Sequence, residues 1–218
     1  GGTYWYRVRA YNWVGGSANS APVNATIVPP AAPYSFTGRI GTNHTVNLAW
    51  IAAYPTDQDG FIVERTADTN GSALWLENGN FAAKNLYWIS YSDTNVTALT
   101  TNWYRVRAYN NVGVSTNSAP FEVRVLPPMS PSFLEASPFA DQVKLTWYVS
   151  YGEYYGNVDG FKIERAPDVN GDPGTWTQVG TTRYTSAYCS YTDTNRPVHT
   201  AWWYRVRAYN WVGDSPYG

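Results

Sequence analysis

One eleven-residue stretch occurs three times in this chain. "WYRVRAYNWVG" occupies residues 5–15 and 203–213, and "WYRVRAYNNVG" occupies residues 103–113. The copies lie about 100 residues apart, which is the length of a small domain rather than of a short solenoid repeat. The spacing therefore predicts tandem domains of one kind.

The repeated stretch has the alternation of a β-strand. In the middle copy, Tyr104 and Val106 face one way, whereas Arg105 and Arg107 face the other. Apolar and polar side chains that alternate with a period of two indicate a half-buried strand. We therefore expect each copy to be a strand with one face in a core.

Other segments recur in the same order and also alternate. They are "VNLAW" (46–50) with "VKLTW" (143–147), "DGFIVERT" (59–66) with "DGFKIERA" (159–166), and "YSDTN" (91–95) with "YTDTN" (191–195). Turn-forming pairs are expected between strands at 59–60, 70–71, 78–79, 159–160 and 170–171, all Asp-Gly or Asn-Gly. Short alternating strands with frequent turns predict an antiparallel sandwich.

Together these motifs resemble fibronectin type III (FN3) domains. A Trp ends an early strand, an aromatic-x-Val-x-Arg or aromatic-x-Ile-x-Arg strand follows, and "YRVRAYN-x-x-G" leads into "S-x-N-S-A-P". The resemblance implies an all-β fold of tandem seven-stranded antiparallel immunoglobulin-like sandwiches, with strands A to G. It covers nearly the whole chain.

The resemblance also implies domain bounds. Residues 1–28 would be strands F and G of an incomplete FN3 domain, 31–127 a complete domain, and 131–218 a domain without its last strand. We expect a segment of a longer repeat array. The alternative is a polymer in which a neighbouring subunit supplies the missing strand by β-augmentation.

Composition excludes several partners. The chain has 218 residues, a formal net charge of −1, 11 Trp, 19 Tyr and a single cysteine. Sparse and balanced charge gives no basic patch for nucleic acid or an anionic membrane. No apolar run approaches the ~20 residues that span a bilayer. We expect no nucleic-acid partner and no membrane span.

Catalytic and metal motifs are weak. The two histidines, His44 and His199, accompany no hydrolase, protease or phosphate-binding signature. We expect no enzyme activity and no cofactor. Residues 57–60 and 168–172 resemble parts of a calcium loop, but hairpin turns explain both, and a loosely bound structural calcium is the alternative.

Cys189 lies in an alternating stretch and is expected to be a small buried hydrophobe.

Charged residues on the repeated strands suggest ion pairs. Glu64 is expected to face outward beside Arg105 and Arg107, and Glu164 repeats the pattern with its own arginines. We interpret these groups as cross-strand pairs on a solvated sheet face, each worth at most ~1 kcal/mol.

Aromatic residues gather in two loops of the last unit. Tyr148, Tyr151, Tyr154 and Tyr155 lie in the expected B–C loop, and Trp211 lies in the expected F–G loop. In the FN3 fold these loops share one pole. The cluster could form a junction between domains or subunits, or a surface for a sugar or protein partner, or it could have no special role.

Four asparagines stand in glycosylation sequons: Asn24, Asn43, Asn70 and Asn95. About this number is expected by chance in a chain rich in Asn, Ser and Thr. They matter only if the protein is secreted by a cell that glycosylates asparagine.

Three functions fit these observations. The first is a non-catalytic structural segment of an extracellular or cell-surface fibre, filament or sheath, whose partners are neighbouring FN3 domains or copies of itself. The second is a spacer or carbohydrate-associated module of a secreted polysaccharide-degrading enzyme. The third is an adhesion module. Unit-to-unit similarity favours the first, and the extracellular location follows from the resemblance alone.

Overall fold

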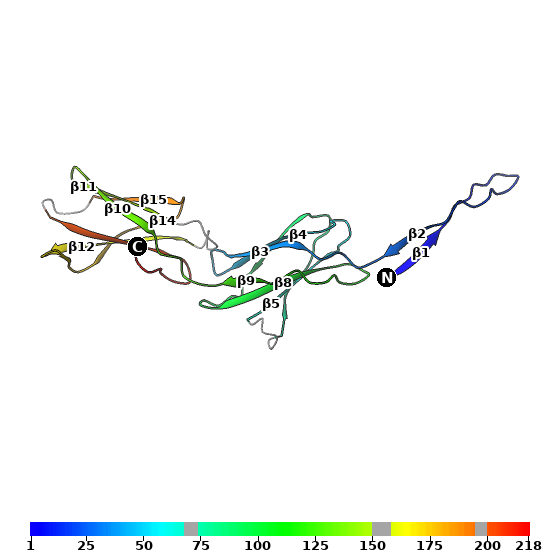
Figure 1. Cartoon of the computed structure of the whole chain (residues 1–218), viewed down its shortest axis with the longest axis horizontal. Helices are drawn as coiled ribbons and strands as arrows, with labels where there is room; N and C mark the ends of the chain where they lie inside the picture. The colour runs from blue at the N-terminus through cyan, green and yellow to red at the C-terminus, as the bar shows by residue number, and fades with distance from the viewer. Residues whose placement is uncertain (68–73, 150–157, 195–199) are drawn as a thin grey trace. The chain divides into compact units, whose positions relative to one another are not determined.

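The fold is taken from a computed structural model that describes residues 1–67, 74–149, 158–194 and 200–218. Within these ranges the regular structure consists of β-strands, and the described strand pairings are antiparallel. The expected all-β fold is therefore confirmed. Figure 1 labels the strands, which fall into a ribbon and two sandwiches.

The ribbon consists of β1 (Gly2–Tyr6) and β2 (Val23–Ile27). Tyr6 is 55% exposed and Val8, just beyond β1, is 73% exposed. Their counterparts in the middle copy of the repeat, Tyr104 and Val106, are completely buried. The ribbon thus exposes to solvent the face that, in the middle copy of the repeat, is buried in a core. A two-stranded ribbon alone is marginally stable.

The first sandwich has seven strands in two sheets. One sheet has the order β3-β4-β7 and the other β6-β5-β8-β9. The strands are β3 (Tyr34–Ile40), β4 (Val46–Ile51), β5 (Gly60–Thr66), β6 (Leu76–Ala82), β7 (Trp88–Asp93), β8 (Thr101–Tyr109) and β9 (Phe121–Arg124). Trp50 packs edge-on against Phe61 at 5.4 Å between ring centroids, and both are fully buried.

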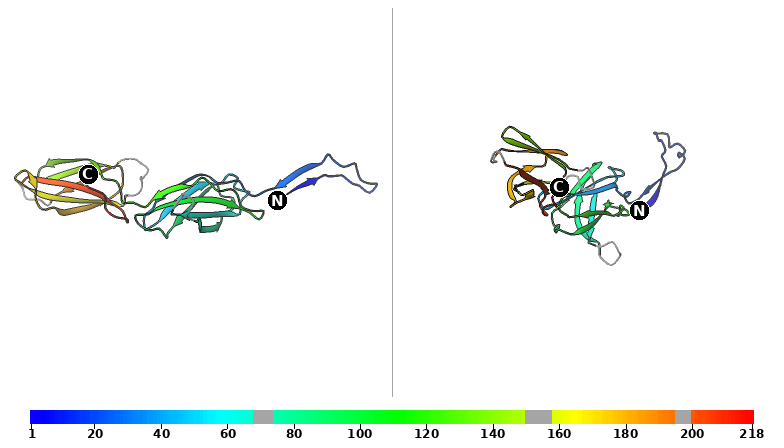
Figure 2. Two further views of the ribbon diagram at one scale, coloured as in Figure 1. Left: turned by 60° about the horizontal axis from the view of Figure 1, so that its bottom comes forward. Right: turned by 60° about the vertical axis from the view of Figure 1, so that its left-hand side comes forward.

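The second sandwich repeats this plan in part: the two-residue strand β13 forms a hairpin with β12, and no described strand takes the place of β9. Its sheets are β10-β11-β15, and β13-β12-β14 with β16 paired to β12. The strands are β10 (Ser132–Phe139), β11 (Gln142–Tyr148), β12 (Gly160–Val169), β13 (Asp172–Pro173), β14 (Thr177–Arg183), β15 (Tyr188–Asp193) and β16 (Trp202–Tyr209). Figure 2 shows the two layers from other directions. Trp147 and Phe161 repeat the core pair of the first sandwich, at 5.2 Å.

The repeated Asp-Gly pairs have a steric cause. A side chain at Gly60 would place its Cβ 2.3 Å from the Phe81 carbonyl oxygen, and one at Gly160 would meet the Thr182 carbonyl oxygen at the same distance. Each glycine begins the strand that follows, β5 or β12, and only glycine lets the neighbouring backbone approach so closely.

The turn predicted at residues 78–79 is not present in the structure. Asn78 and Gly79 lie inside strand β6 rather than between strands. The register places Val63 opposite Gly79 and Glu64 opposite Glu77, which leaves Asn78 as the extra residue of a β-bulge. A bulge and a turn favour the same residue types, so the sequence could not separate them.

Two compact units describe the packing of the chain. The first comprises Gly1–Thr37, Ala49–Ser90 and Trp103–Phe121, and the second comprises Gly38–Leu48, Tyr91–Asn102 and Glu122–Gly218. This division differs from the expected bounds 1–28, 31–127 and 131–218, although β3–β9 and β10–β16 fall within the last two ranges. The domain bounds therefore stay a prediction.

Candidate functional site

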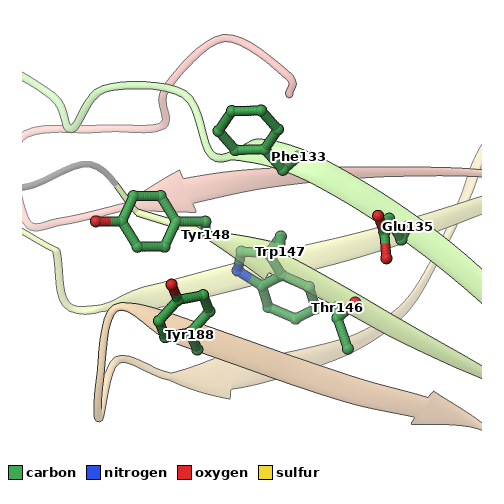
Figure 3. A pocket seen from close by; sticks show the side chains of 6 residues that line it. All are labelled: Phe133, Glu135, Thr146, Trp147, Tyr148 and Tyr188. Carbon is green, nitrogen blue, oxygen red and sulfur yellow. The ribbon is translucent and has the colours of Figure 1, made fainter.

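An aromatic pocket lies on the β10-β11-β15 sheet of the second sandwich. Its volume is about 350 Å³. Six residues line it: Phe133, Glu135, Thr146, Trp147, Tyr148 and Tyr188. Figure 3 shows the two tyrosine rings at one end and Glu135 with Thr146 at the other. We call this set the aromatic pocket.

Strand pairing brings the two tyrosines together. Tyr148 on β11 lies directly opposite Tyr188 on β15, and their ring centroids are 5.1 Å apart at an interplanar angle of 55°. The rings form two walls of a corner rather than a parallel stack. Cross-strand aromatic pairs also stabilise a sheet.

A bulge in β10 positions the third ring. The register shifts between Ser132, opposite Tyr148, and Glu135, opposite Thr146. Phe133 lies in this shift with a φ of 55°, which is unusual for a residue other than glycine. Its side chain is 80% exposed. The bulge therefore presents a large apolar ring to solvent at the mouth of the pocket.

Glu135 brings a charge to the pocket. It is exposed, and among the described residues it is the only charged one that lines the pocket. Trp147 is 2% exposed, and its indole nitrogen has no hydrogen-bond partner among the described residues. Because Trp50 in the first sandwich has the same unpartnered nitrogen, that feature reflects the shared core and is no sign of a ligand.

Of the predicted aromatic cluster, the structure places Tyr148 in the pocket. Tyr151, Tyr154 and Tyr155 lie outside the described residues. Trp211 does not line the pocket. Its role as a junction or partner residue stays a prediction.

Trp211 makes its contacts within the second compact unit. Its indole N–H donates to the Gly41 carbonyl at 2.9 Å, and its ring lies 4.7 Å from the His44 ring. His199, the other histidine, lies outside the described residues.

Phe133, Glu135 and Tyr188 were not anticipated from the sequence. Tyr188 reaches the pocket because β15 pairs with β11, about 40 residues earlier in the chain, and Phe133 reaches it because of the bulge in β10. The available signal was the difference between the two units: Phe133 occupies the position of Ser35, and both residues have a positive φ.

The expectation that Glu64 lies on a solvated sheet face is wrong. Glu64 is only 7% exposed, although it pairs as expected with Arg105 at 2.6 Å and Arg107 at 3.2 Å. The Arg105 guanidinium lies 4.2 Å from the centre of the Trp75 ring. The stacked arginine and tryptophan shield the carboxylate from water, and no pattern in the sequence indicates this stacking.

Glu164 is buried to the same extent in the second sandwich, so the same expectation is wrong there. It accepts two hydrogen bonds from Arg205 (2.8 and 2.6 Å), one from Arg207 (3.3 Å) and one from the Tyr217 hydroxyl (2.9 Å). Arg205 lies between the Trp176 and Tyr217 rings, at 4.1 and 3.7 Å. Burial alone would raise the pKa of Glu164, but the bonds from Arg205 and Tyr217 and the arginine charges hold that pKa below its usual value.

The turn after each copy of the repeated strand is built in the same way. The Oδ1 atoms of Asn12, Asn110 and Asn210 each accept two backbone N–H groups at 2.8–3.2 Å. The Nδ2 group of Asn110 also donates to the Val28 carbonyl at 3.4 Å, and that of Asn210 to the Leu126 carbonyl at 3.0 Å. Val28 and Leu126 each precede a Pro-Pro pair. The asparagine therefore joins its own turn to a proline segment about 80 residues earlier.

Two further expectations are confirmed. Cys189 belongs to the core of the second sandwich, and burial raises the pKa of its thiol. Residues 168–172 form a hairpin turn between β12 and β13, with positive φ at Asn170 and Gly171. The same explanation is wrong for residues 57–60, which lead from β4 into β5, a strand of the other sheet. Among the described residues, no group of three or more His, Cys, Asp or Glu could hold a metal ion.

The sequons are accessible where they are described. Asn24, Asn43 and Asn95 are exposed, and Asn70 lies outside the described residues. Their glycosylation stays a prediction. Within the described ranges, no helix has the length and apolar character needed to cross a bilayer.

Comparisons with known proteins give similarities to solved structures only. No protein-family model and no curated protein matches the chain. Among solved structures, the FN1–FN3 domains of chicken CNTN1 match at 18% identity and a TM-score of 0.43, over 98% of this chain and 75% of that one. We draw no argument from a TM-score this low. The strand order stands on its own: three strands face four in the first sandwich, the second repeats this order without a described counterpart of β9, and the chain has a tandem FN3-like fold.

Proposed function

We propose that this chain is a non-catalytic structural segment of an extracellular or cell-surface fibre, filament or sheath built from tandem FN3-like units. The observation that carries the proposal is the asparagine turn, which recurs three times and twice bonds to a proline segment. A repeated bond between this turn and a proline segment about 80 residues earlier would limit the motion of that segment.

Near-identical packing inside the units supports the same function. The Trp–Phe core pair, the buried glutamate with its two arginines and the stacked tryptophan occur in both sandwiches. When equivalent residues keep equivalent contacts, successive units present similar surfaces. Similar surfaces let one interface form repeatedly along an assembly. The partners would be neighbouring units and further copies of this chain.

Electron microscopy of the native, unconcentrated protein tests the proposal. We expect regular filaments or sheets whose axial repeat equals one or two unit lengths. Monodisperse, flexible particles would overturn the structural function and favour a spacer in a larger secreted protein.

A matched pair of variants tests the role of the asparagine turn. Asn210→Asp keeps the Oδ1 acceptor that closes the turn but removes the Nδ2 donor to Leu126. Asn12→Asp is the control, because Asn12 makes the same turn and has no described bond to a proline segment. We expect Asn210→Asp, and not Asn12→Asp, to broaden the distance distribution in small-angle X-ray scattering and to shorten the filaments. Equal behaviour of the two variants would contradict the stiffening role.

A further inference from the structure

We infer that the aromatic pocket is a binding site for a neutral sugar ring of an oligosaccharide or polysaccharide. This inference is independent of the proposed fibre, because a fibre, a spacer or an adhesion module could each bind a glycan. It assigns a ligand class to Phe133, Glu135, Thr146, Tyr148 and Tyr188.

The exposed rings supply an apolar wall. Phe133 and Tyr188 are each 80% exposed, and Tyr148 joins Tyr188 to form the corner. Rings at such positions gain little from the protein's own core, whereas a ligand would remove them from water. A pyranose ring presents faces of C–H groups that pack against aromatic rings. Rigid tyrosines bind such faces with little loss of side-chain entropy.

Polar atoms lie at the other end of the pocket. The Glu135 carboxylate and the Thr146 hydroxyl both line it, beyond Trp147 from the tyrosines (Figure 3). No described residue forms a salt bridge with Glu135. A carboxylate can accept hydrogen bonds from two sugar hydroxyls, and charge assistance strengthens such bonds.

Size and charge exclude other ligand classes. Among the described residues no Lys or Arg lines the pocket, so phosphate groups, nucleic acid and acidic sugars would meet a repelling carboxylate. A volume of about 350 Å³ lies at the lower end for small-molecule sites. A stable protein interface needs roughly 800 Å² on each partner, far more than this pocket offers. A single uncharged ring with several hydroxyls is the chemistry that fits.

The first sandwich does not carry the same residues. By alignment of the repeats, Phe133, Glu135, Thr146, Tyr148 and Tyr188 correspond to Ser35, Thr37, Ala49, Ile51 and Trp88. One exposed ring, Trp88, is retained there, and Thr37 carries a hydroxyl where Glu135 carries its carboxylate, but the tyrosine corner and the carboxylate are missing. The site therefore distinguishes the second sandwich from the first and is no general feature of the fold.

The test uses the whole chain and a panel of neutral hexasaccharides: cellohexaose, laminarihexaose, xylohexaose, mannohexaose and maltohexaose. We expect at least one to bind in isothermal titration calorimetry with a Kd of roughly 0.1–1 mM, as one shallow pocket allows. Tyr188→Ala should weaken this binding at least tenfold. Glu135→Gln, which keeps the shape and removes the charge, should weaken it about tenfold.

Trp88→Ala is the matched control, since it removes the exposed ring at the equivalent position of the first sandwich. It should leave sugar binding unchanged. Thermal unfolding verifies that each variant folds, and Phe133→Ala provides a second variant should Tyr188→Ala unfold.

Two results would overturn the inference. The first is the absence of saturable binding by every sugar at about 10 mM. The second is binding that survives both Tyr188→Ala and Phe133→Ala. A further result also counts against a sugar: self-association of the chain that only the pocket variants abolish would make a second copy the occupant. Filaments seen by electron microscopy without sugar binding would refute this inference and leave the proposed function standing.

Discussion

Replacing the buried carboxylate of Glu164 should destabilise the second sandwich selectively. The side chain is 9% exposed and accepts bonds from Arg205, Arg207 and Tyr217. Glu164→Gln keeps the size, removes the charge and turns an amide group toward arginine donors. Breaking a buried ion pair on one side costs about 3–5 kcal/mol.

For Glu164→Gln, the expected loss of unfolding free energy lies below that range. The Arg205 and Arg207 side chains are 28% and 26% exposed, so water can solvate part of the charge that Glu164 leaves. We therefore expect a loss of about 2–3 kcal/mol in the unfolding free energy of the second sandwich. At 1.36 kcal/mol for each factor of ten, amide exchange through unfolding should accelerate about 30- to 150-fold.

Hydrogen exchange followed by mass spectrometry measures this within the intact chain. Peptides from β12 and β16 report on the second sandwich, and peptides from β5 and β8 of the first serve as an internal control. Glu64→Gln should instead accelerate exchange in β5 and β8 and leave exchange in β12 and β16 unchanged. An acceleration below about threefold in β12 and β16 would mean that the carboxylate behaves like a surface ion pair, and the argument from burial would fail.

The same carboxylate predicts a dependence on pH. Since its interactions lower the pKa of Glu164 in the folded chain, they contribute stability that is fully present above the unfolded pKa of about 4.3. That stability is lost as pH falls through the lower, folded pKa. The exchange difference between wild type and Glu164→Gln should therefore shrink below about pH 4.3. A difference that grows toward acid would contradict the sign of the shift.

Three further predictions concern the cores. Trp50→Ala removes a fully buried indole and should cost about 3–5 kcal/mol, seen in calorimetry as a lower transition for the first sandwich alone; an unchanged scan would argue against that core. Gly160→Ala places a Cβ 2.3 Å from the Thr182 carbonyl and should cost about 1–3 kcal/mol in urea unfolding, whereas a neutral effect would mean that the sheet relaxes. Cys189, whose pKa burial raises, should react with iodoacetamide at pH 8 far more slowly than in urea; equal rates would contradict its burial.

Much of the fold follows from the sequence itself. Alternation placed Tyr104 and Val106 inside and identified the strands that became β4, β5 and β8. These predictions are confirmed because the alternation of side chains along a strand is a local property. The repeat adds support, since the same alternation occurs in equivalent segments of both units. The Asn170-Gly171 turn was also predictable, because few residues adopt positive φ.

Tertiary structure alone decided three features. The burial of Glu64 and Glu164 depends on tryptophans that reach the arginines from another part of each sheet. The bulge at Asn78 depends on its partner strand, since the residue type suits a turn equally well. The aromatic pocket depends on β10, β11 and β15 meeting in one register.

The difference between the features that the sequence predicts and those that only the tertiary structure decides has a single physical reason. The face of a strand is set by neighbours one or two residues away, which the sequence displays. Strand pairing decides which side chain covers a charge and which rings meet across a sheet. The paired residues lie from 11 positions apart (Glu135 and Thr146) to 41 (Glu64 and Arg105). Sequence thus determined the strands and their repetition, and only the folded sheets determined where the chain carries a site.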